Sequence, residues 1–388
     1  MVKLPIVIAA LCAGLLTVTA HANETLKIGL SLPLSGPGAN WGRGNEWMCH
    51  KASQEINDAG GVHVNGKTYD LKCIAYDNKY TSSEGIKVAQ TLINRDNIKY
   101  LFVFGTPPLL ATQPLAEREG VLLFDGSWAL NTKGPKFPMT FSCENSPFEM
   151  GPAMISYVTT AHPQAKTVVM LNVNDASGQD TARVLRSAME KKGLKVLASD
   201  FVERSTTEFQ PIAARLFSKK PDIVLLGSIP PASAGEVWKE LDILGFKGVK
   251  ILANGDSIQG LVATAGQAAN GVYMGGAVPF DGSSATPYQR KVNDEESAAI
   301  GEALGFSSIG AYDFVNIVKA ALEKAQSLDP RKLAAIMPTV KFHTFYGGET
   351  GFGGKEIYGS VQQTILPVYI TQIVNGKLVE KARVMPSD

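Results

Sequence analysis

Residues 26–42, Leu-Lys-Ile-Gly-Leu-Ser-Leu-Pro-Leu-Ser-Gly-Pro-Gly-Ala-Asn-Trp-Gly, decide the fold of this chain. The apolar residues 26–30 are typical of a buried strand, and residues 42–57 predict a helix that the turn 58–61 ends. The glycine-rich residues 35–42 join the two. A strand, a glycine-rich loop and a helix in this order are the opening unit of a parallel sheet with helices on its faces. We therefore predict an α/β fold.

The same alternation continues along the chain and forms two sets. The first set predicts strands at residues 71–76, 100–104 and 121–124 and helices at 82–94 and 110–119. The second predicts strands at 167–172, 195–201, 222–227 and 250–253 and helices at 150–161, 178–192, 209–218 and 234–244. A strand at 271–277, helices at 288–304 and 309–327, and a strand at 368–374 follow. Two doubly wound sheets indicate two Rossmann-like lobes.

The N-terminus has the pattern of a secretory signal peptide. Lys3 is followed by the apolar residues 6–16 and by Ala-His-Ala at residues 20–22, a small-x-small cleavage site. We expect residues 1–22 to be removed and the mature protein to be exported to the periplasm. The apolar run is too short to span a bilayer, which needs about 20 residues. A lipid anchor at Cys12 is disfavoured because a leucine precedes that cysteine.

Charge and length restrict the partners. The chain has 37 Lys and Arg residues against 36 Asp and Glu residues among 388, and removal of residues 1–22 takes away one lysine and leaves 36 against 36. A neutral, evenly charged chain offers no electrostatic attraction to nucleic acid or to anionic membranes. This length suits two domains. We expect a monomer that binds neither nucleic acid nor a membrane surface.

Three cysteines remain in the mature chain: Cys49, Cys73 and Cys143. Cys49 lies in the first predicted helix and Cys73 in the second predicted strand, which are neighbours in a βαβ unit, so this pair is our first choice for a disulfide. Three buried free thiols are the alternative. The histidines are not spaced for metal binding, and we expect neither a metal nor a cofactor.

Sequence motifs for catalysis are missing. The loop at residues 35–42 departs from the dinucleotide fingerprint, because its third glycine is displaced and Pro37 interrupts it. No nucleophile elbow, zincin motif or P-loop occurs. An enzyme would need a concealed acid and base, for which Asp125 and Asp256 are the candidates. We therefore favour a binding protein over an enzyme.

Two tryptophans follow predicted strands at the edge where open α/β sheets bind ligands. Trp41 follows the first strand and Trp128 the fourth. Their position favours contact with a flat apolar ligand, and packing beneath a loop is the alternative. Trp47 and Trp238 lie within predicted helices, where they are interpreted as packing residues.

Several segments together resemble the branched-chain amino-acid-binding family of periplasmic proteins. They are Leu-Lys-Ile-Gly-Leu-Ser-Leu-Pro-Leu-Ser-Gly-Pro at 26–37, Glu-Ile-Asn-Asp-Ala-Gly-Gly at 55–61, Tyr-Asp-Asn at 76–78, Ala-Thr-Gln-Pro-Leu-Ala at 111–116, Gly-Val-Tyr at 271–273 and Ala-Tyr-Asp at 311–313. The resemblance covers nearly all of the mature chain. It implies a type I periplasmic-binding fold, in which three crossings join two lobes and the ligand lies between them.

The resemblance also implies the position of the crossings and of the site. Crossings are expected near residues 143–147, 276–280 and 345–354, so that residues 23–145 with 278–347 form one lobe and residues 146–277 with 348–388 the other. The ligand is expected to lie between loops that follow strands of both lobes. These loops and the crossing that follows them carry the candidate residues Trp41, Thr106, Leu109, Ser127, Trp128, Phe148, Ser177, Ile229 and Asp256.

Departures from the family pattern bear on the ligand. Leu109 stands where a serine is expected, Ala129 replaces a threonine and Ser177 replaces a tyrosine, whereas Asp256 matches the acidic partner of the ammonium group. A cage for a zwitterion is thus incomplete, and an unpaired buried charge is costly. We predict an aromatic or other largely apolar carboxylate as ligand. A branched-chain or other amino acid is the alternative.

The expected mechanism is closure of the two lobes on the ligand, which favours the closed state because it contacts both lobes. The closed form would then be recognised by the membrane subunits of an ABC transporter.

Overall fold

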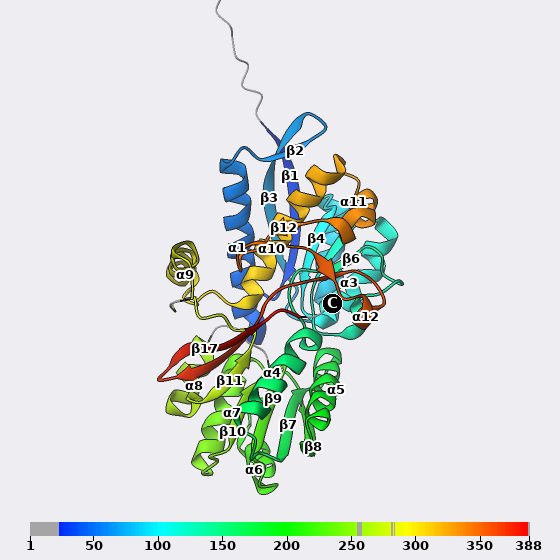
Figure 1. The fold of residues 1–388 in the computed structure, drawn as a ribbon. Helices are drawn as coiled ribbons and strands as arrows, with labels where there is room; N and C mark the ends of the chain where they lie inside the picture. Colours follow the sequence, from blue (N-terminus) through cyan, green and yellow to red (C-terminus); the bar gives the residue numbers. More distant parts are fainter. Residues whose placement is uncertain (1–22, 254–257, 281, 283, 387–388) are drawn as a thin grey trace, which may run out of the picture.

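The computed structural model describes residues 23–253, 258–280, 282 and 284–386, and it has two lobes, each built on one sheet (Figure 1). The sheet of the first lobe has the strand order β2-β3-β1-β4-β5-β6. Its strands are β1 (Glu24–Leu32), β2 (Val62–Val64), β3 (Lys67–Asp77), β4 (Tyr100–Phe104), β5 (Leu122–Gly126) and β6 (Thr140–Ser142). From β3 to β6 every neighbouring pair is parallel, as the alternation of strands and helices predicts.

Alternate residues of the central strands enter two different cores. In β4, Tyr100, Phe102 and Phe104 face one side of the sheet, where α1 (Ala39–Asp58) and α10 (Phe306–Ala325) pack. Leu101 and Val103 face the other side, which α2 (Ser82–Gln90) and α3 (Thr106–Glu119) cover. A strand that is buried on both faces is expected to be apolar throughout, as β4 is.

The second lobe repeats this architecture around a seven-stranded sheet of order β17-β16-β11-β10-β9-β7-β8. Its strands are β7 (Thr167–Val173), β8 (Lys195–Val202), β9 (Ile223–Gly227), β10 (Val249–Leu252), β11 (Val272–Gly275), β16 (Val368–Val374) and β17 (Lys377–Val384). Its helices are α4 (Pro147–Ala161), α5 (Ala176–Lys191), α6 (Gln210–Ser218), α7 (Pro231–Ile243) and α8 (Gln259–Ala265). The last two strands are antiparallel and close one edge.

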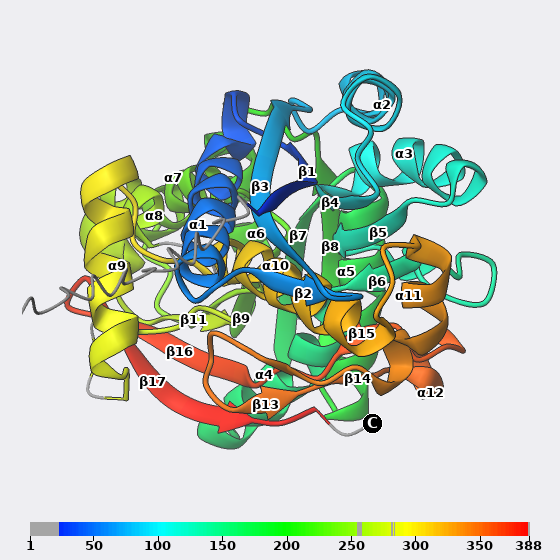
Figure 2. The same cartoon turned by 90° about the horizontal axis from the view of Figure 1, so that it is seen from above.

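The chain returns to the first lobe after β11 and adds several short elements there. Figure 2 shows α9 beside α1, with α10 and α11 on the same side of the first sheet. The added elements are α9 (Pro287–Ile300), α11 (Pro330–Ile336), β12 (Phe342–His343), β13 (Glu349–Thr350), β14 (Phe352–Gly353), α12 (Lys355–Tyr358) and β15 (Gln363–Thr364).

The third crossing lies later in the chain than expected. Phe352 is buried in the core of the first lobe, and the amide of Ser142 at the end of β6 donates to the carbonyl of Gln362 at 2.8 Å. Residues up to 364 therefore pack with the first lobe, and the chain crosses at residues 365–367, not at 345–354. Within the expected range, Gly347, Gly348 and Gly354 have positive φ angles, which suit tight turns.

Cys49 of α1 and Cys73 of β3 form a disulfide with 6.3 Å between their Cα atoms, and Cys143 is a buried free thiol. This is the pairing that the sequence favours. In the part of the chain that the structure describes, no helix is long and apolar enough to cross a membrane, and no group of three or more His, Cys, Asp or Glu side chains is arranged to hold a metal ion.

Candidate ligand-binding site

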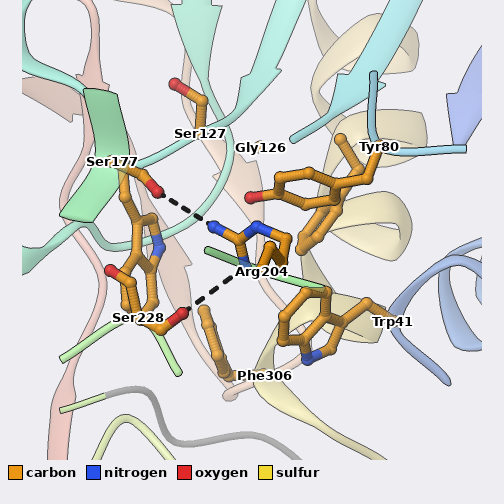
Figure 3. Close-up of a pocket in the computed structure, with 10 residues that line it drawn as sticks. Trp41, Tyr80, Gly126, Ser127, Ser177, Arg204, Ser228 and Phe306 are labelled. Carbon is orange, nitrogen blue, oxygen red and sulfur yellow. Dashed lines mark hydrogen bonds between the residues drawn. The ribbon is translucent and has the colours of Figure 1, made fainter. Parts of the chain in front are cut away.

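A cavity lies between the lobes, where the strands of both sheets end, and encloses about 390 Å³ of empty space, part of it open to solvent (Figure 3). Five of the ten described residues that line it are aromatic: Trp41, Tyr80, Phe104, Trp128 and Phe306. The other residues that line it are Gly126 and Ser127 from the first lobe and Ser177, Arg204 and Ser228 from the second. Both lobes thus contribute to a single cavity.

The aromatic rings pack against one another in two groups. The Trp41 ring lies 6.0 Å from that of Tyr80 and 5.9 Å from that of Phe104, measured between centroids. The ring of Trp128 stacks on that of Phe306 at 6.0 Å. Such contacts hold the rings in place and leave flat apolar surfaces. The wall is therefore suited to a planar apolar group.

Arg204 brings a positive charge into this aromatic cavity. It lies two residues after β8, and its side chain is 17% exposed. The guanidinium donates to Oδ2 of Asp175 from Nη2 at 2.6 Å and from Nε at 3.2 Å. It also lies over the ring of Tyr80, 4.3 Å from the centroid, and so contacts the first lobe. Among the described residues that line the cavity, Arg204 is the one with a charged side chain.

Asp175 fixes this arginine and begins α5. Its carboxylate accepts from the amide of Gly178 at 3.0 Å and from the Ser177 hydroxyl at 2.5 Å, as a helix N-cap does. Burial would raise the pKa of Asp175, but the charge of Arg204 and these hydrogen bonds outweigh it and hold the pKa below its ordinary value. Arg204 and Asp175 therefore form a pre-organised ion pair at the cavity.

Ser228 supports Arg204 through its backbone. It follows β9 with a φ of 56°, in the left-handed region that is uncommon for residues other than glycine. Its carbonyl accepts from Nη1 of Arg204 at 3.4 Å, and its hydroxyl lies 2.9 Å from that of Thr181. Figure 3 shows Ser177 and Ser228 joined to the guanidinium by these hydrogen bonds. Strain of this kind is common at binding sites.

Ser127 differs from the other polar residues that line the cavity. It is 3% exposed, and its hydroxyl has no hydrogen-bond partner among the described residues. A buried hydroxyl without a partner costs about 1–3 kcal/mol. A ligand or water that bonded to this hydroxyl would remove that cost.

The structure brings four of the nine residues expected from the sequence to the cavity wall: Trp41, Ser127, Trp128 and Ser177. Thr106 lies behind the wall, where its hydroxyl accepts from the amide of Trp128 at 3.2 Å. Phe148 packs against Tyr358, with 6.1 Å between ring centroids. Asp256 lies outside the described residues.

Leu109 and Ile229, expected at the ligand, are buried in the cores. For Leu109 the reason is the start of α3, which begins at Thr106 and not at residue 110, so that Leu109 lies on the inner face of its first turn. Ile229 follows Ser228 directly, and it is the preceding residue that lines the cavity.

Sequence reasoning missed six residues of the wall: Tyr80, Phe104, Gly126, Arg204, Ser228 and Phe306. The rule that ligands bind beyond the carboxyl ends of parallel strands could have found the first five, because each ends a strand or follows one within three residues. Phe306 begins α10 after the second crossing, and its position depends on how the chain returns to the first lobe.

The lobes contact each other across the cavity. The amide of Leu130 in the first lobe donates to Oδ2 of Asp180 on α5 at 2.7 Å, and Arg204 covers Tyr80. A hydrogen bond and a cation–π contact between lobes require that the lobes lie close together. The structure is therefore a closed arrangement.

Comparison with known proteins identifies the family. Residues 25–377 match the model of the periplasmic binding protein family. The leucine-, isoleucine-, valine-, threonine- and alanine-binding protein of Pseudomonas aeruginosa is 26% identical over 341 residues, which cover 86% of this chain and 87% of that protein.

Two solved structures have a similar fold. A solute-binding protein of an ABC transporter from Rhodopseudomonas palustris, in complex with 3,4-dihydroxybenzoic acid, superposes with a TM-score of 0.78 at 22% identity and covers 94% of this chain and 98% of that one. A leucine-binding protein from Thermotoga maritima has a TM-score of 0.78 at 19% identity and covers 92% and 98%. With a family match over most of its length and a fold shared with solute-binding proteins, this chain belongs to the periplasmic binding protein family.

Proposed function

We propose that this protein captures a small aromatic carboxylate between its two lobes and delivers it to the membrane subunits of an ABC importer. The observation that carries the proposal is the combination of a wall of aromatic rings with one charged side chain, that of Arg204. A flat apolar wall selects a ring, and a cation selects an anion. An aromatic carboxylate has both features.

The guanidinium keeps a donor for such an anion. Arg204 makes two hydrogen bonds to Asp175, one to Ser177 and a long one to Ser228. A guanidinium has five N–H groups, so one remains for a ligand, and the long bond to the Ser228 carbonyl is readily exchanged for a carboxylate oxygen. Low solvent access strengthens that contact.

A branched-chain amino acid is the second candidate, because relatives of this chain bind such ligands. Its ammonium group needs a buried acceptor that carries a negative charge. Asp175, behind the wall, is already paired with Arg204, and no acidic side chain lines the cavity within the described residues. The positive charge of Arg204 also repels an ammonium group. The aromatic carboxylate therefore remains the preferred ligand.

An enzyme in the same cavity is disfavoured. Asp125, one of the two acids considered for catalysis, is fully buried and paired with Lys133 at 3.3 Å. Asp125 is therefore not available to act as an acid or base on a ligand in the cavity. The family consists of transport proteins that bind their substrates without chemical change.

The cellular setting follows from the same function. A periplasmic binding protein meets its ligand outside the cytoplasmic membrane, and residues 1–22 would direct export as a cleaved signal peptide. We propose that the mature chain acts as a monomer and without nucleic acid, since a ligand cleft between two lobes is complete in one chain.

Titration calorimetry with four compounds tests the proposal. Benzoate and 3,4-dihydroxybenzoate provide a ring and a charge, benzamide provides the same ring without the charge, and leucine provides a charged zwitterion without a ring. We expect one or both acids to bind with one site per chain, benzamide to bind at least about tenfold more weakly because it cannot form the charged pair, and leucine not to bind. Tight binding of leucine with no response to either acid would refute the aromatic preference.

A further inference from the structure

A loop that lines the cavity is held at its base by a buried ion pair. This cavity loop, residues 126–133, begins after Asp125 of β5 and includes the lining residues Gly126, Ser127 and Trp128. Its last residue, Lys133, returns to Asp125, with 3.3 Å between Nζ and Oδ2 and no exposure of either side chain. A buried ion pair that lost one partner would leave a costly charge, so the two ends of the loop stay together.

The ion pair rests on Tyr358 of α12. Nζ of Lys133 lies 4.6 Å from the centroid of the Tyr358 ring, within the range of a cation–π contact. Tyr358 is 6% exposed and belongs to the part of the chain that packs with the first lobe before the third crossing. The position of this ring therefore sets the position of Lys133 and of the cavity loop.

The hydroxyl of the same tyrosine contacts the second lobe. It donates to Oε1 of Glu149 at 2.7 Å and lies 2.9 Å from the hydroxyl of Ser146. Ser146 is the N-cap of α4, and Oε2 of Glu149 accepts from the Ser146 amide at 2.8 Å, which completes a capping box. Tyr358 thus joins the first turn of α4, and with it the first crossing between the lobes.

α4 moves with the second lobe. It packs on α5 and on strands β11 and β16 of that sheet. The residues just before it, 143–146, form the first crossing and so part of the axis about which the lobes rotate. A contact at this point restrains the direction in which α4 leaves the first lobe.

We infer that Tyr358 is a positioning residue that couples the cavity loop to the hinge. Its ring supports Lys133 at the base of the loop, and its hydroxyl orients the start of α4. The position of the cavity loop, which contacts the ligand, and the angle between the lobes therefore both depend on this one buried side chain. Coupling between sites needs an element that both sites bias, and Tyr358 with Lys133 is that element here. The inference rests on the lobe closure proposed above, but it can be tested without any ligand.

The test is hydrogen exchange of the ligand-free protein, read at the amides of the cavity loop. Tyr358→Phe keeps the ring and removes the hydroxyl, and Glu149→Ala removes the acceptor of the same hydrogen bond. Tyr100→Phe is the matched control, because Tyr100 is 1% exposed and its hydroxyl donates to the carbonyl of Leu328 at 2.7 Å within the first lobe. Glu149→Gln keeps an acceptor and a capping-box side chain.

We expect exchange in the cavity loop to become about tenfold faster in Tyr358→Phe and in Glu149→Ala, and to be unchanged in Tyr100→Phe. Exchange in Glu149→Gln should stay within about twofold of that in the wild type. The double variant Tyr358→Phe with Glu149→Ala should exchange no faster than the faster of the two single variants, because both substitutions remove the same hydrogen bond. Equal exchange in Tyr358→Phe and the wild type would overturn the inference. An equal rise in the exchange rate of the cavity loop in Tyr100→Phe would also overturn it, since that outcome would indicate general destabilisation of the first lobe.

A second measurement keeps the two proposals separable. Small-angle scattering of the ligand-free variants should give a broader distribution of interatomic distances for Tyr358→Phe than for Tyr100→Phe, because α4 is less constrained at the hinge. This result depends on no ligand. Failure of the aromatic ligand therefore leaves the coupling intact, and failure of the coupling leaves the ligand proposal intact.

Discussion

Arg204 is the residue to which the proposed function assigns the selectivity of an apolar cavity. Its charge is anchored by Asp175, braced by the carbonyl of Ser228 and covered by the Tyr80 ring. An arginine held this firmly loses little side-chain entropy when it bonds to a ligand. In the proposed function the aromatic residues supply contact area, and the arginine selects the charge of the ligand.

Replacement of Arg204 by methionine should weaken binding of an aromatic carboxylate about 10- to 150-fold, because a hydrogen bond to a charged group contributes about 1.5–3 kcal/mol. Calorimetric titration with benzoate measures the change. Arg215→Met is the control, since Arg215 is paired with Asp200 at 2.7 Å on the same lobe but is not part of the cavity. An unchanged affinity in Arg204→Met would remove this arginine from the site.

Asp313 on α10 predicts a dependence of stability on pH. It is fully buried, and burial raises its pKa from 3.8 to about 7 despite hydrogen bonds from the Thr344 hydroxyl and the Phe345 amide. Between about pH 4 and pH 7 the folded protein therefore holds a proton that the unfolded chain has released. The contribution of this group to stability is thus largest at low pH and is lost as the pH rises to 7.

The variant Asp313→Asn tests whether the contribution of Asp313 to stability falls as the pH rises. Asparagine is neutral at every pH; its Oδ1 can accept from the Phe345 amide and its Nδ2 can donate to the Thr344 hydroxyl. The melting temperature of the variant should therefore rise relative to that of the wild type as the pH increases from about 4 to 7. Differential scanning calorimetry across this range gives the comparison. A difference in melting temperature that is constant with pH would contradict the buried titration.

At the scale of elements, the sequence predicts the central strands and helices well because their periodicity is strong. The predicted strand at residues 100–104 coincides with β4, and the strand at 368–374 coincides with β16. The start of α3 was predicted four residues late, since Pro107 and Pro108 resemble helix breakers although proline is favoured in a first helical turn. The exposed strand β17 was missed because only alternate residues of it are partly buried.

The disulfide between α1 and β3 should contribute to the stability of the first lobe. It closes a loop across a sequence separation of 24, for which the loss of chain entropy in the unfolded state predicts about 3 kcal/mol. Replacement of both Cys49 and Cys73 by alanine should lower the free energy of unfolding by about that amount, as measured by denaturation in urea. Cys143→Ala is the control, and a double variant as stable as the wild type would show that the disulfide carries no stability.

At the scale of the whole molecule, the aromatic wall of the cavity could be predicted only in part. Trp41 and Trp128 follow strands of the first sheet, and the rule that ligands bind beyond the carboxyl ends of strands predicts both of them. Phe306 instead reaches the cavity from a helix that returns to the first lobe after the second crossing. The prediction of the third crossing was wrong for a related reason, because short hairpins such as β14–β15 pack against segments that are distant in the sequence. Contacts between segments far apart in the chain depend on the assembled fold.

Closure of the molecule should depend on the hydrogen bond between the lobes at Asp180. Asp180→Ala removes the acceptor of the Leu130 amide and should weaken ligand binding about 10-fold or more by favouring the open state, since a hydrogen bond to a charged group contributes about 1.5–3 kcal/mol. Calorimetry measures the affinity, and small-angle scattering the shift to the open form. Asp200→Ala, which breaks an ion pair within the second lobe, is the matched control. Equal effects of the two substitutions would contradict a role in closure.

The cleft of this periplasmic binding protein is proposed to hold an aromatic carboxylate. The most direct measurement is mass spectrometry of the small molecule released by denaturation from protein purified without ligand exchange. We expect an aromatic carboxylate in a ratio of about one molecule to one chain. Recovery of leucine, isoleucine or valine in that ratio would contradict it.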